Sequence, residues 1–439
     1  MSKPREQVVG YLPDETPTPG KLLLFAFQQL LVMFPATVTV ALLTGFHVST
    51  TIFASGLATL TFLLITKGKI PLYYGSSFSY IAAIISVTGV TSGIAADGLI
   101  SQAQFGIIMS GLVSIAAGLI VSRFGMDVIE KVLPPTVTGS IAMVIGISLA
   151  GSAITGAAGY TGGAASDKAW IAALVTLFAT IAFSVYLKGV WGQLPILFGI
   201  LVGYVVSIPL GLVDFSAIWT GTLVEVPHFT LPVANWAAVG AIMPIAIATI
   251  PESTAHLFQL DIYVNDLAKR KGAKEYKIAD KLGINLIGDG IGDMVAALFG
   301  GPAGTNYGEN ISTMAITKNF SVKVLGVAAI MAMVLSFVQP LSNAIRSVPS
   351  AVINGACIYL FGVIGAQGVA IMINKKVDLF DAKNLAVIAV ILVVGLGGSY
   401  GFSNGMIPFF GAELPAIATA ATLGIVMNLL LSIGRKKGA

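Results

Sequence analysis

Long apolar segments limit what this chain can fold into more than any other feature. A helix needs about 17 to 25 apolar residues to cross the hydrocarbon of a bilayer. Only 10% of the 439 residues are charged, against about 25% in soluble domains, so we predict an all-α polytopic membrane protein. Segments 71–91 and 300–318 are apolar but begin with Gly, Pro and Ser, and they bring the predicted crossings to fourteen. The others are predicted at 21–45, 48–66, 101–121, 136–153, 169–187, 193–213, 233–257, 277–299, 321–342, 350–373, 384–398 and 414–433.

The basic residues predict the orientation of these crossings. Lys and Arg gather in the short cytoplasmic loops of membrane proteins. With fourteen crossings, one side receives every Lys and Arg except Lys168 and Arg346. A miscounted crossing would reverse the sides downstream of it, so the pattern supports fourteen crossings with both termini cytoplasmic. Residues 1–20 contain no apolar run after a basic start, and no cleavable signal peptide is expected.

Fourteen crossings divide into two sets of seven, with a seam in or near 214–232. Because seven is odd, the second set is predicted to be inverted relative to the first. Segments 71–91 and 300–318 are then the third crossing of each set. Interrupted segments at corresponding positions of two halves indicate the binding site of a secondary transporter.

Both interrupted segments are predicted to change from extended backbone to a short helix. Gly and Pro disfavour a helix at 300–304, and a helix of about two turns is expected from Glu309. The earlier segment has Pro71 and a Gly-Ser-Ser run before a helix that opens at Phe78. Extended backbone at membrane depth must be buried in protein or line a cavity. The two segments are expected to pair as short antiparallel strands, although 300–318 alone also fits an ordinary loop.

Five ionisable residues lie inside predicted crossings, where each costs about 2.5–3.5 kcal/mol to insert. Glu252 and His256 share a helix face and mark either a substrate and proton site or a buried pair. Asp289 and Asp293 have the same spacing among glycines, and close helix packing, ligand contact and a cation site all remain open for them. The fifth is Glu309, at the start of the predicted half-helix.

Several other chemistries lack the residues that they need. The sequence has no phosphate-binding loop, no H-E-x-x-H and no C-x-x-C, so no enzyme, metal site or cofactor is predicted. Cys357 is the single cysteine and lies in an apolar segment. His47 and His228 lie at loop edges, where no function is expected for them. The net charge of +4 comes from short loops and predicts no nucleic-acid partner.

The tenth predicted crossing carries a motif of a known family. The run Tyr307-Gly308-Glu309-Asn310-Ile311, with Met314-Ala315-Ile316-Thr317 after it, resembles the signature of bacterial uracil permeases. These belong to the nucleobase–ascorbate (nucleobase:cation symporter-2) transporters. Further resemblances, to the first, third and eighth crossings of the family, are spread over about residues 28–385. The run Glu252-x-x-x-His256 resembles part of the eighth crossing. Thr305 and Met314 depart from the broader family motif.

The resemblance implies a 7+7 inverted repeat in which a core domain moves against a gate domain. It also implies proton symport, a homodimer in the cytoplasmic (inner) membrane, and a nucleobase substrate. The proton is the expected coupling ion, with Na⁺ left open. The implied division is an N-terminal segment 1–20, core parts 21–133 and 233–347, and gate parts 134–232 and 348–439.

The resemblance also implies a binding site between the two half-helices. Carboxylates would accept hydrogen bonds from ring N–H groups, backbone N–H groups would donate to ring carbonyls, and two aromatic rings would flank the substrate. Proton coupling is assigned to Glu252 and His256, and secondary roles to Asp289, Asp293 and Asn310. The expected substrate-binding residues are Ser77, Phe78, Glu252, Tyr307, Gly308 and Glu309.

Uracil is the expected substrate, because a neutral ring with N–H donors and carbonyl acceptors suits carboxylates and backbone donors. The same residues argue against an anion exchanger, which would place positive groups at the breaks. Pro251 and Asp293 depart from the pattern expected for uracil permeases, which leaves xanthine or another purine as the alternative. A channel or receptor that uses the same cavity is the alternative of a different class.

Overall fold

The computed structural model describes residues 10–90, 93–125, 131–160, 164–216, 218–402, 405–410 and 412–433. Residues 1–9 of the predicted N-terminal segment lie outside this part, as do the basic residues 435–437 that contributed to the predicted orientation. Each of the fourteen predicted crossings contains at least one helix among the described residues.

The first half of the chain consists of long helices with one interrupted segment in the third place, in the order predicted. Its elements are α1 (Pro19–Thr44), α2 (Val48–Ile65), β1 (Tyr74–Ser76), η1 (Phe78–Tyr80), α3 (Ile81–Thr88), α4 (Asp97–Phe124), α6 (Pro135–Ser148), α7 (Ala150–Ala157), α8 (Asp167–Tyr186), η2 (Trp191–Gln193) and α9 (Pro195–Ser207).

The second half repeats that order, with its own interrupted segment in the third place. Its elements are α10 (Trp236–Ile242), η3 (Met243–Ile245), α11 (Ala246–Lys271), η4 (Ala279–Lys281), α12 (Leu282–Leu298), β2 (Gly304–Asn306), α13 (Gly308–Thr317), α14 (Val322–Leu335), α15 (Gln339–Arg346), α16 (Ser350–Asn374), α17 (Ala382–Gly401), β3 (Met406–Phe409), β4 (Ala412–Pro415) and α18 (Ala416–Leu430).

Among the described residues, eight helical stretches are long and apolar enough to cross a membrane. Four shorter apolar helices include the half-helix that starts at Phe78. This confirms a mostly helical membrane protein. The eight stretches are Pro19–Thr44, Val48–Ile65, Asp97–Phe124, Pro135–Ala157, Asp167–Tyr186, Trp236–Lys271, Ser350–Asn374 and Ala382–Gly401.

The two interrupted segments meet, as predicted. β1 pairs with β2 in antiparallel register, with Tyr74 opposite Asn306 and Ser76 opposite Gly304. The pairing satisfies backbone groups that no water could reach in a membrane interior. The alternative of an ordinary loop at 300–318 is therefore wrong.

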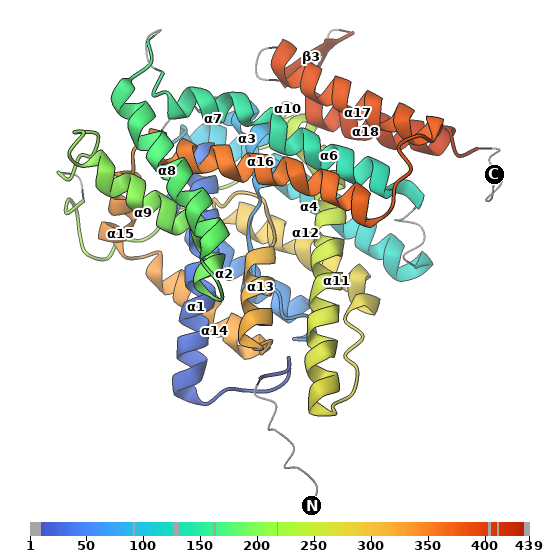
Figure 1. Ribbon diagram of the computed structural model, residues 1–439, viewed down its shortest axis with the longest axis horizontal. Helices are drawn as coiled ribbons and strands as arrows, with labels where there is room; N and C mark the ends of the chain where they lie inside the picture. Colours follow the sequence, from blue (N-terminus) through green and yellow to red (C-terminus); the bar gives the residue numbers. More distant parts are fainter. Residues whose placement is uncertain are drawn as a thin grey trace, which may run out of the picture.

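Helices of the two halves pack against each other around this strand pair. α12 runs along α4, and α14 runs along α2. The contact between α4 and α12 depends on two facing glycines, since a Cβ atom on Gly290 would lie within van der Waals overlap of the Gly111 carbonyl oxygen. Figure 1 shows α13 between α1 and α11, at the end of the molecule where the described chain begins.

Three local features were not predicted from the sequence. A short 3-10 helix, Met243–Ile245, interrupts the eighth crossing, whereas α11 continues through Pro251. α11 also runs to Lys271, well beyond the predicted end at 257, because a helix that leaves the hydrocarbon no longer needs apolar residues. Finally, β3 and β4 form a second antiparallel hairpin before α18, and no strand was predicted there.

Candidate functional site

Two short helices begin where the strand pair ends. The Ser77 N–H donates to the Ala303 carbonyl at 2.9 Å, and the Tyr307 N–H donates to the Tyr73 carbonyl at 3.0 Å. η1 starts directly after Ser77, and α13 starts directly after Tyr307. The first N–H groups of a helix have no partner within it and carry a partial positive charge. Each break therefore presents donors suited to a carbonyl or an anion.

The strands leave no room for side chains on two of their glycines. A Cβ atom on Gly75 would lie 2.4 Å from the ring of Tyr307, and one on Gly304 would lie 2.3 Å from the ring of Tyr74. Real Cβ atoms do not approach other atoms so closely. Glycine at both positions is thus a packing requirement of the strand pair.

Two carboxylates come to this point from different helices. Glu252 of α11 accepts a hydrogen bond from the Ser79 hydroxyl of η1 at 3.2 Å. Glu309 lies in the first turn of α13, and the preceding residue, Gly308, is in close contact with His256, one turn from Glu252 on α11. Both residues are only partly buried, although the strands beside them are fully buried. The predicted acids therefore converge on the start of both half-helices.

His256 lies one turn from Glu252 and faces the start of α13. A Cβ atom on Gly308 would lie 2.9 Å from Nε2 of His256, so the imidazole and this glycine are in close contact. Nδ1 of His256 is buried and has no hydrogen-bond partner among the described residues. Glu252 bonds to Ser79, and within the described chain no hydrogen bond joins Glu252 to His256. These contacts do not support the alternative of a self-satisfied buried pair.

The two aromatic residues predicted to flank the substrate have different surroundings. Tyr307 is buried, and its hydroxyl donates to the Ser76 carbonyl at 2.9 Å and lies 3.0 Å from the Thr37 hydroxyl of α1. Tyr307 thus ties α1 to the strand pair. Phe78 is partly buried and packs beside an apolar cluster that includes Val40 and Ile81. Ligand contact remains a prediction for both residues.

Asp293 of α12 forms hydrogen bonds to both strands of the pair. Its carboxylate accepts hydrogen bonds from the Gly304 N–H at 2.6 Å and from the Tyr74 hydroxyl at 2.7 Å. Asp289, one turn earlier, accepts from Asn306 Nδ2 at 2.9 Å and from the hydroxyl of Ser253. Both acids therefore hold β1 and β2 against α12, which is the packing role that the sequence left open.

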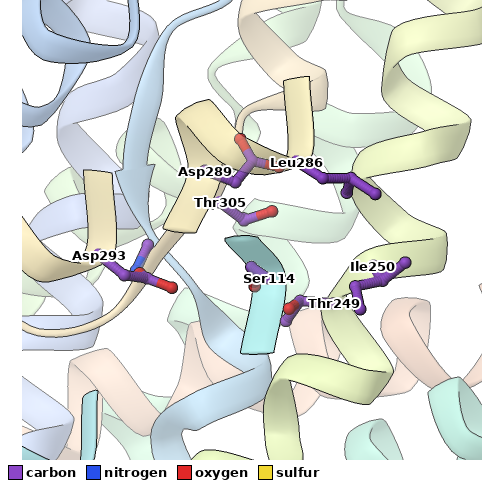
Figure 2. A pocket seen from close by; sticks show the side chains of 8 residues that line it. Ser114, Thr249, Ile250, Leu286, Asp289, Asp293 and Thr305 are labelled. Carbon is purple, nitrogen blue, oxygen red and sulfur yellow. The ribbon is translucent and has the colours of Figure 1, made fainter. Parts of the chain in front are cut away.

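A small cavity adjoins these aspartates (Figure 2). The cavity lies between α12, which carries the two carboxylates, and side chains of α4 and α11. The residues that line it are Ser114, Thr249, Ile250, Leu286, Asp289, Asp293, Gly304 and Thr305.

Asn310, predicted as a secondary site residue, faces α1. Its Nδ2 donates to the side-chain oxygen of Gln29 at 2.7 Å and to the Gln29 carbonyl at 3.0 Å. Asn310 Oδ1 and Gln29 Nε2 are buried without partners among the described residues. The pair joins α13 to α1 and keeps one acceptor and one donor unused.

Sequence reasoning missed several uncharged residues of the site. Ser79 binds Glu252, and Ser253 links Asn285 and Asn306 to Asp289. The prediction considered only ionisable residues inside crossings. Buried Asn and Ser in otherwise apolar helices also need partners, and that signal would have found Asn285 and Ser253.

Comparison with known proteins gives the family of the chain. Residues 20–404 match the sequence model Xan_ur_permease, described as "Permease family". The chain is 38% identical over 433 residues to the uracil permease of Bacillus caldolyticus, across 97% of this chain and 95% of that protein. It is 35% identical over 438 residues to the uracil permease of Bacillus subtilis strain 168, across 97% and 96%. The putative pyrimidine permease RutG of Escherichia coli strain K12 is 34% identical over 427 residues, across 96% and 91%.

Solved structures share the fold. The transmembrane domain of a cyanobacterium bicarbonate transporter, BicA, matches with a TM-score of 0.55 and 13% identity, across 98% of this chain and 100% of that chain. The murine anion transporter Slc26a9 in its inward-facing state matches with a TM-score of 0.64 and 13% identity, across 99% and 72%. The shared fold is a 7+7 inverted repeat, as predicted. From the motif, the sequence relatives and this fold, the chain belongs to the permease family that includes the bacterial uracil permeases, and it is a transporter and not an enzyme.

Proposed function

We propose that the protein is a secondary active transporter that imports uracil together with a proton. The observation that carries the proposal is the convergence of Glu252 and Glu309 on the N-termini of η1 and α13. This arrangement offers carboxylate acceptors and backbone donors within one site. Uracil presents ring N–H donors beside carbonyl acceptors, so its hydrogen-bonding edge complements both sets.

In this proposal Glu252 and Glu309 accept hydrogen bonds from ring N–H groups. Backbone N–H groups near Phe78 and Gly308 donate to ring carbonyls, and Phe78 and Tyr307 border the ring. Two of the relatives above are named uracil permeases and a third a putative pyrimidine permease. Those names support a pyrimidine as the substrate.

We propose that transport moves a core domain, 21–133 with 233–347, against a gate domain, 134–232 with 348–439. The packing agrees with this division. Within the proposed core, α12 runs along α4 and α14 along α2; within the proposed gate, α16 contacts α6 and α8. We further propose a homodimer in the inner membrane, with fourteen crossings and both termini in the cytoplasm.

A substrate screen tests the proposed function. Purified protein is titrated with uracil, thymine, xanthine, guanine, adenine and urate, and the thermal midpoint is followed for each compound, since a ligand stabilises the folded state that binds it. We expect uracil to give the largest rise at equal concentration. A larger rise with xanthine would assign the protein to purines.

Uptake separates a transporter from a channel or receptor. Proteoliposomes loaded with unlabelled uracil are diluted into labelled uracil, and counterflow is measured with and without an inward proton gradient. We expect saturable counterflow and accumulation that depends on the gradient. Absence of saturable counterflow would favour a channel or receptor. Accumulation that follows a Na⁺ gradient would identify Na⁺, and not the proton, as the coupling ion.

A further inference from the structure

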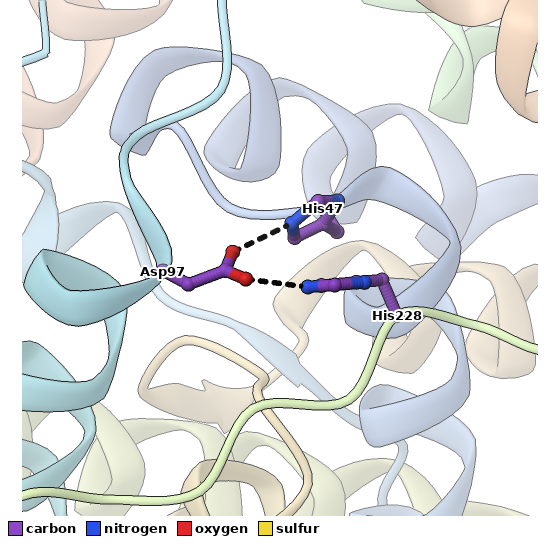
Figure 3. A group of neighbouring side chains, drawn as sticks. All are labelled: His47, Asp97 and His228. Atoms are coloured by element: carbon purple, nitrogen blue, oxygen red, sulfur yellow. Dashed lines mark hydrogen bonds and ion pairs between the residues drawn. The ribbon is translucent and has the colours of Figure 1, made fainter.

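Three side chains that the substrate site does not use meet at the start of α2 and α4 (Figure 3). His47 precedes α2, Asp97 is the first residue of α4, and His228 belongs to the linker between α9 and α10. His47 Nε2 lies 3.5 Å from one carboxylate oxygen of Asp97, and His228 Nε2 lies 2.8 Å from the other. One donor atom from each residue lies within 4.8 Å of the other two.

Hydrogen bonding accounts for only part of this arrangement. His228 forms a hydrogen bond with Asp97, whereas Nε2 of His47, which is buried, lies 3.5 Å from Asp97 and forms no hydrogen bond among the described residues. The two imidazole rings also lie 4.4 Å apart. A buried ring nitrogen without a hydrogen bond costs free energy unless an ion or another group satisfies it.

The three donors are those that zinc prefers. Zn²⁺ takes imidazole nitrogen and carboxylate oxygen at about 2.0–2.2 Å, so neighbouring donors of a tetrahedral site lie about 3.3 Å apart. His47 Nε2 lies 3.5 Å from one oxygen of Asp97 and His228 Nε2 lies 2.8 Å from the other, so both imidazole nitrogens face the same carboxylate. Three protein donors leave a fourth position for water. Side chains of Asp97 and His228 are about half exposed, so an ion from solution has access.

The ligands are held in place by other contacts. The Thr50 hydroxyl of α2 donates to the His228 carbonyl at 2.7 Å. Two residues later, Gln104 Nε2 of α4 donates to the Thr230 carbonyl at 2.8 Å. The linker is thereby fixed against α2 at His228 itself and against α4 two residues later. A site that is already assembled loses little conformational entropy when it binds an ion.

We propose that His47, Asp97 and His228 bind one divalent transition-metal ion of the zinc type. The ion would fasten the linker of residues 208–235, which follows α9, to the N-termini of α2 and α4. No residue of this cluster belongs to η1, α11 or α13, which carry the substrate site. The proposal therefore stands or fails independently of the substrate.

Direct titration tests the site. The chain has three histidines and one cysteine, and that cysteine is buried, so competing sites are few. The full-length protein is purified with an affinity tag that contains no histidine, treated with a chelator, and titrated with ZnCl₂ in a calorimeter. We expect one equivalent of Zn²⁺ per chain. Mg²⁺ should bind at least tenfold more weakly, since it prefers oxygen donors.

Three variants locate the ion. Asp97→Asn and His228→Gln keep the size of the side chain, and each should weaken Zn²⁺ binding at least tenfold. Asp167→Asn is the matched control, because Asp167 is also an exposed acid at the first position of a long helix, α8. It should bind Zn²⁺ as the unaltered protein does.

Thermal unfolding provides a second readout that does not depend on transport. Zn²⁺ should raise the midpoint of the unaltered protein and of Asp167→Asn, but not that of Asp97→Asn. Midpoints measured without zinc show whether each variant is folded. The absence of saturable Zn²⁺ binding to the unaltered protein, or equal binding by all variants, would overturn the proposal and leave a hydrogen-bonded His–Asp–His cluster only.

Discussion

The Ser79 hydroxyl donates a hydrogen bond to the Glu252 carboxylate at 3.2 Å, and this contact joins the half-helix of the third crossing to α11 of the eighth. The two residues are 173 positions apart in the sequence. The bond fixes one carboxylate oxygen of Glu252, and in the proposed function the other accepts a hydrogen bond from the ligand. Ser79 is thus a positioning residue of the proposed uracil site.

Ser79→Ala should weaken uracil binding by about tenfold to a hundredfold, because a hydrogen bond to a charged group contributes about 1.5–3 kcal/mol. Calorimetric titration of the purified variant measures the change. Ser86→Ala is the matched control, since the Ser86 hydroxyl bonds only to the Ala83 carbonyl of its own helix among the described contacts. Equal losses of uracil affinity in both variants would mean that the substitutions disturb this half-helix in general, and would contradict a specific role of Ser79 in positioning Glu252.

Glu309→Gln should abolish or severely weaken nucleobase binding while the protein still folds. The carboxylate lies in the first turn of α13, where the helix dipole favours an anion. Replacement by an amide that turns its NH₂ group toward a ring N–H leaves that donor unpaired, at a cost of about 1–3 kcal/mol. Affinity is measured by thermal shift over a range of uracil concentrations. Near-normal affinity in a well-folded variant would refute the role of Glu309.

Gly308→Leu should block uptake, because its side chain would meet His256 at the point where the backbone must approach the ligand. Overpacking of this kind costs about 1–3 kcal/mol. Gly362→Leu on α16 is the control, since a Cβ atom there meets nothing within 4 Å. Initial uptake rates in proteoliposomes compare the two. Unchanged kinetics in Gly308→Leu would mean that the start of α13 does not contact the substrate. A bulky residue at Ser77 should act in the same way.

The sequence was sufficient to predict the strand pair, because the reasons are local and strong. Gly and Pro exclude a helix, and a membrane interior provides no water for the freed backbone groups. The pairing of the two strands could be predicted because 71–91 and 300–318 hold the same position in the two halves. The register of the pairing could not be predicted, since the packing of Gly75 against the Tyr307 ring depends on tertiary contacts.

The roles of the aspartates could not be predicted for a similar reason. Spacing places Asp289 and Asp293 on one face of α12, but it does not say what that face contacts. The structure places the Gly304 N–H and the Tyr74 hydroxyl beside Asp293. Both bonds are made to the same oxygen of Asp293, Oδ1, so a substrate-tuning role for this residue, which favoured a purine, stays a prediction.

Fold alone does not decide the substrate. The solved structures that share this fold at 13% identity are described as bicarbonate and anion transporters. An anion at the two breaks would face Glu252 and Glu309, and like charges repel. A neutral ring with N–H donors meets no such penalty, so the acids at the breaks support the proposed nucleobase substrate over an anion.

The last prediction concerns coupling. Glu252 and Glu309 both lie beside the starts of the half-helices, and among the described residues no Lys or Arg forms an ion pair with either. A proton on Glu252 removes the repulsion between the two acids. The site then binds substrate while it carries one negative charge instead of two. Proton and uracil would bind as linked ligands, each raising the affinity for the other by the same factor.

Glu252→Gln should therefore still exchange uracil across a membrane but lose the accumulation that a pH gradient drives. His256→Ala should shift the pH optimum of uptake more than the range of substrates, because the imidazole is one turn from Glu252 and contacts the start of α13. Uptake into proteoliposomes is measured with and without an inward proton gradient at several external pH values, and counterflow in the same vesicles shows that each variant is active. If Glu252→Gln still concentrates uracil in response to the gradient, the proton takes another route. Asp289 and Asp293 are then the next residues to replace, because they are the other carboxylates within the crossings that surround the strand pair.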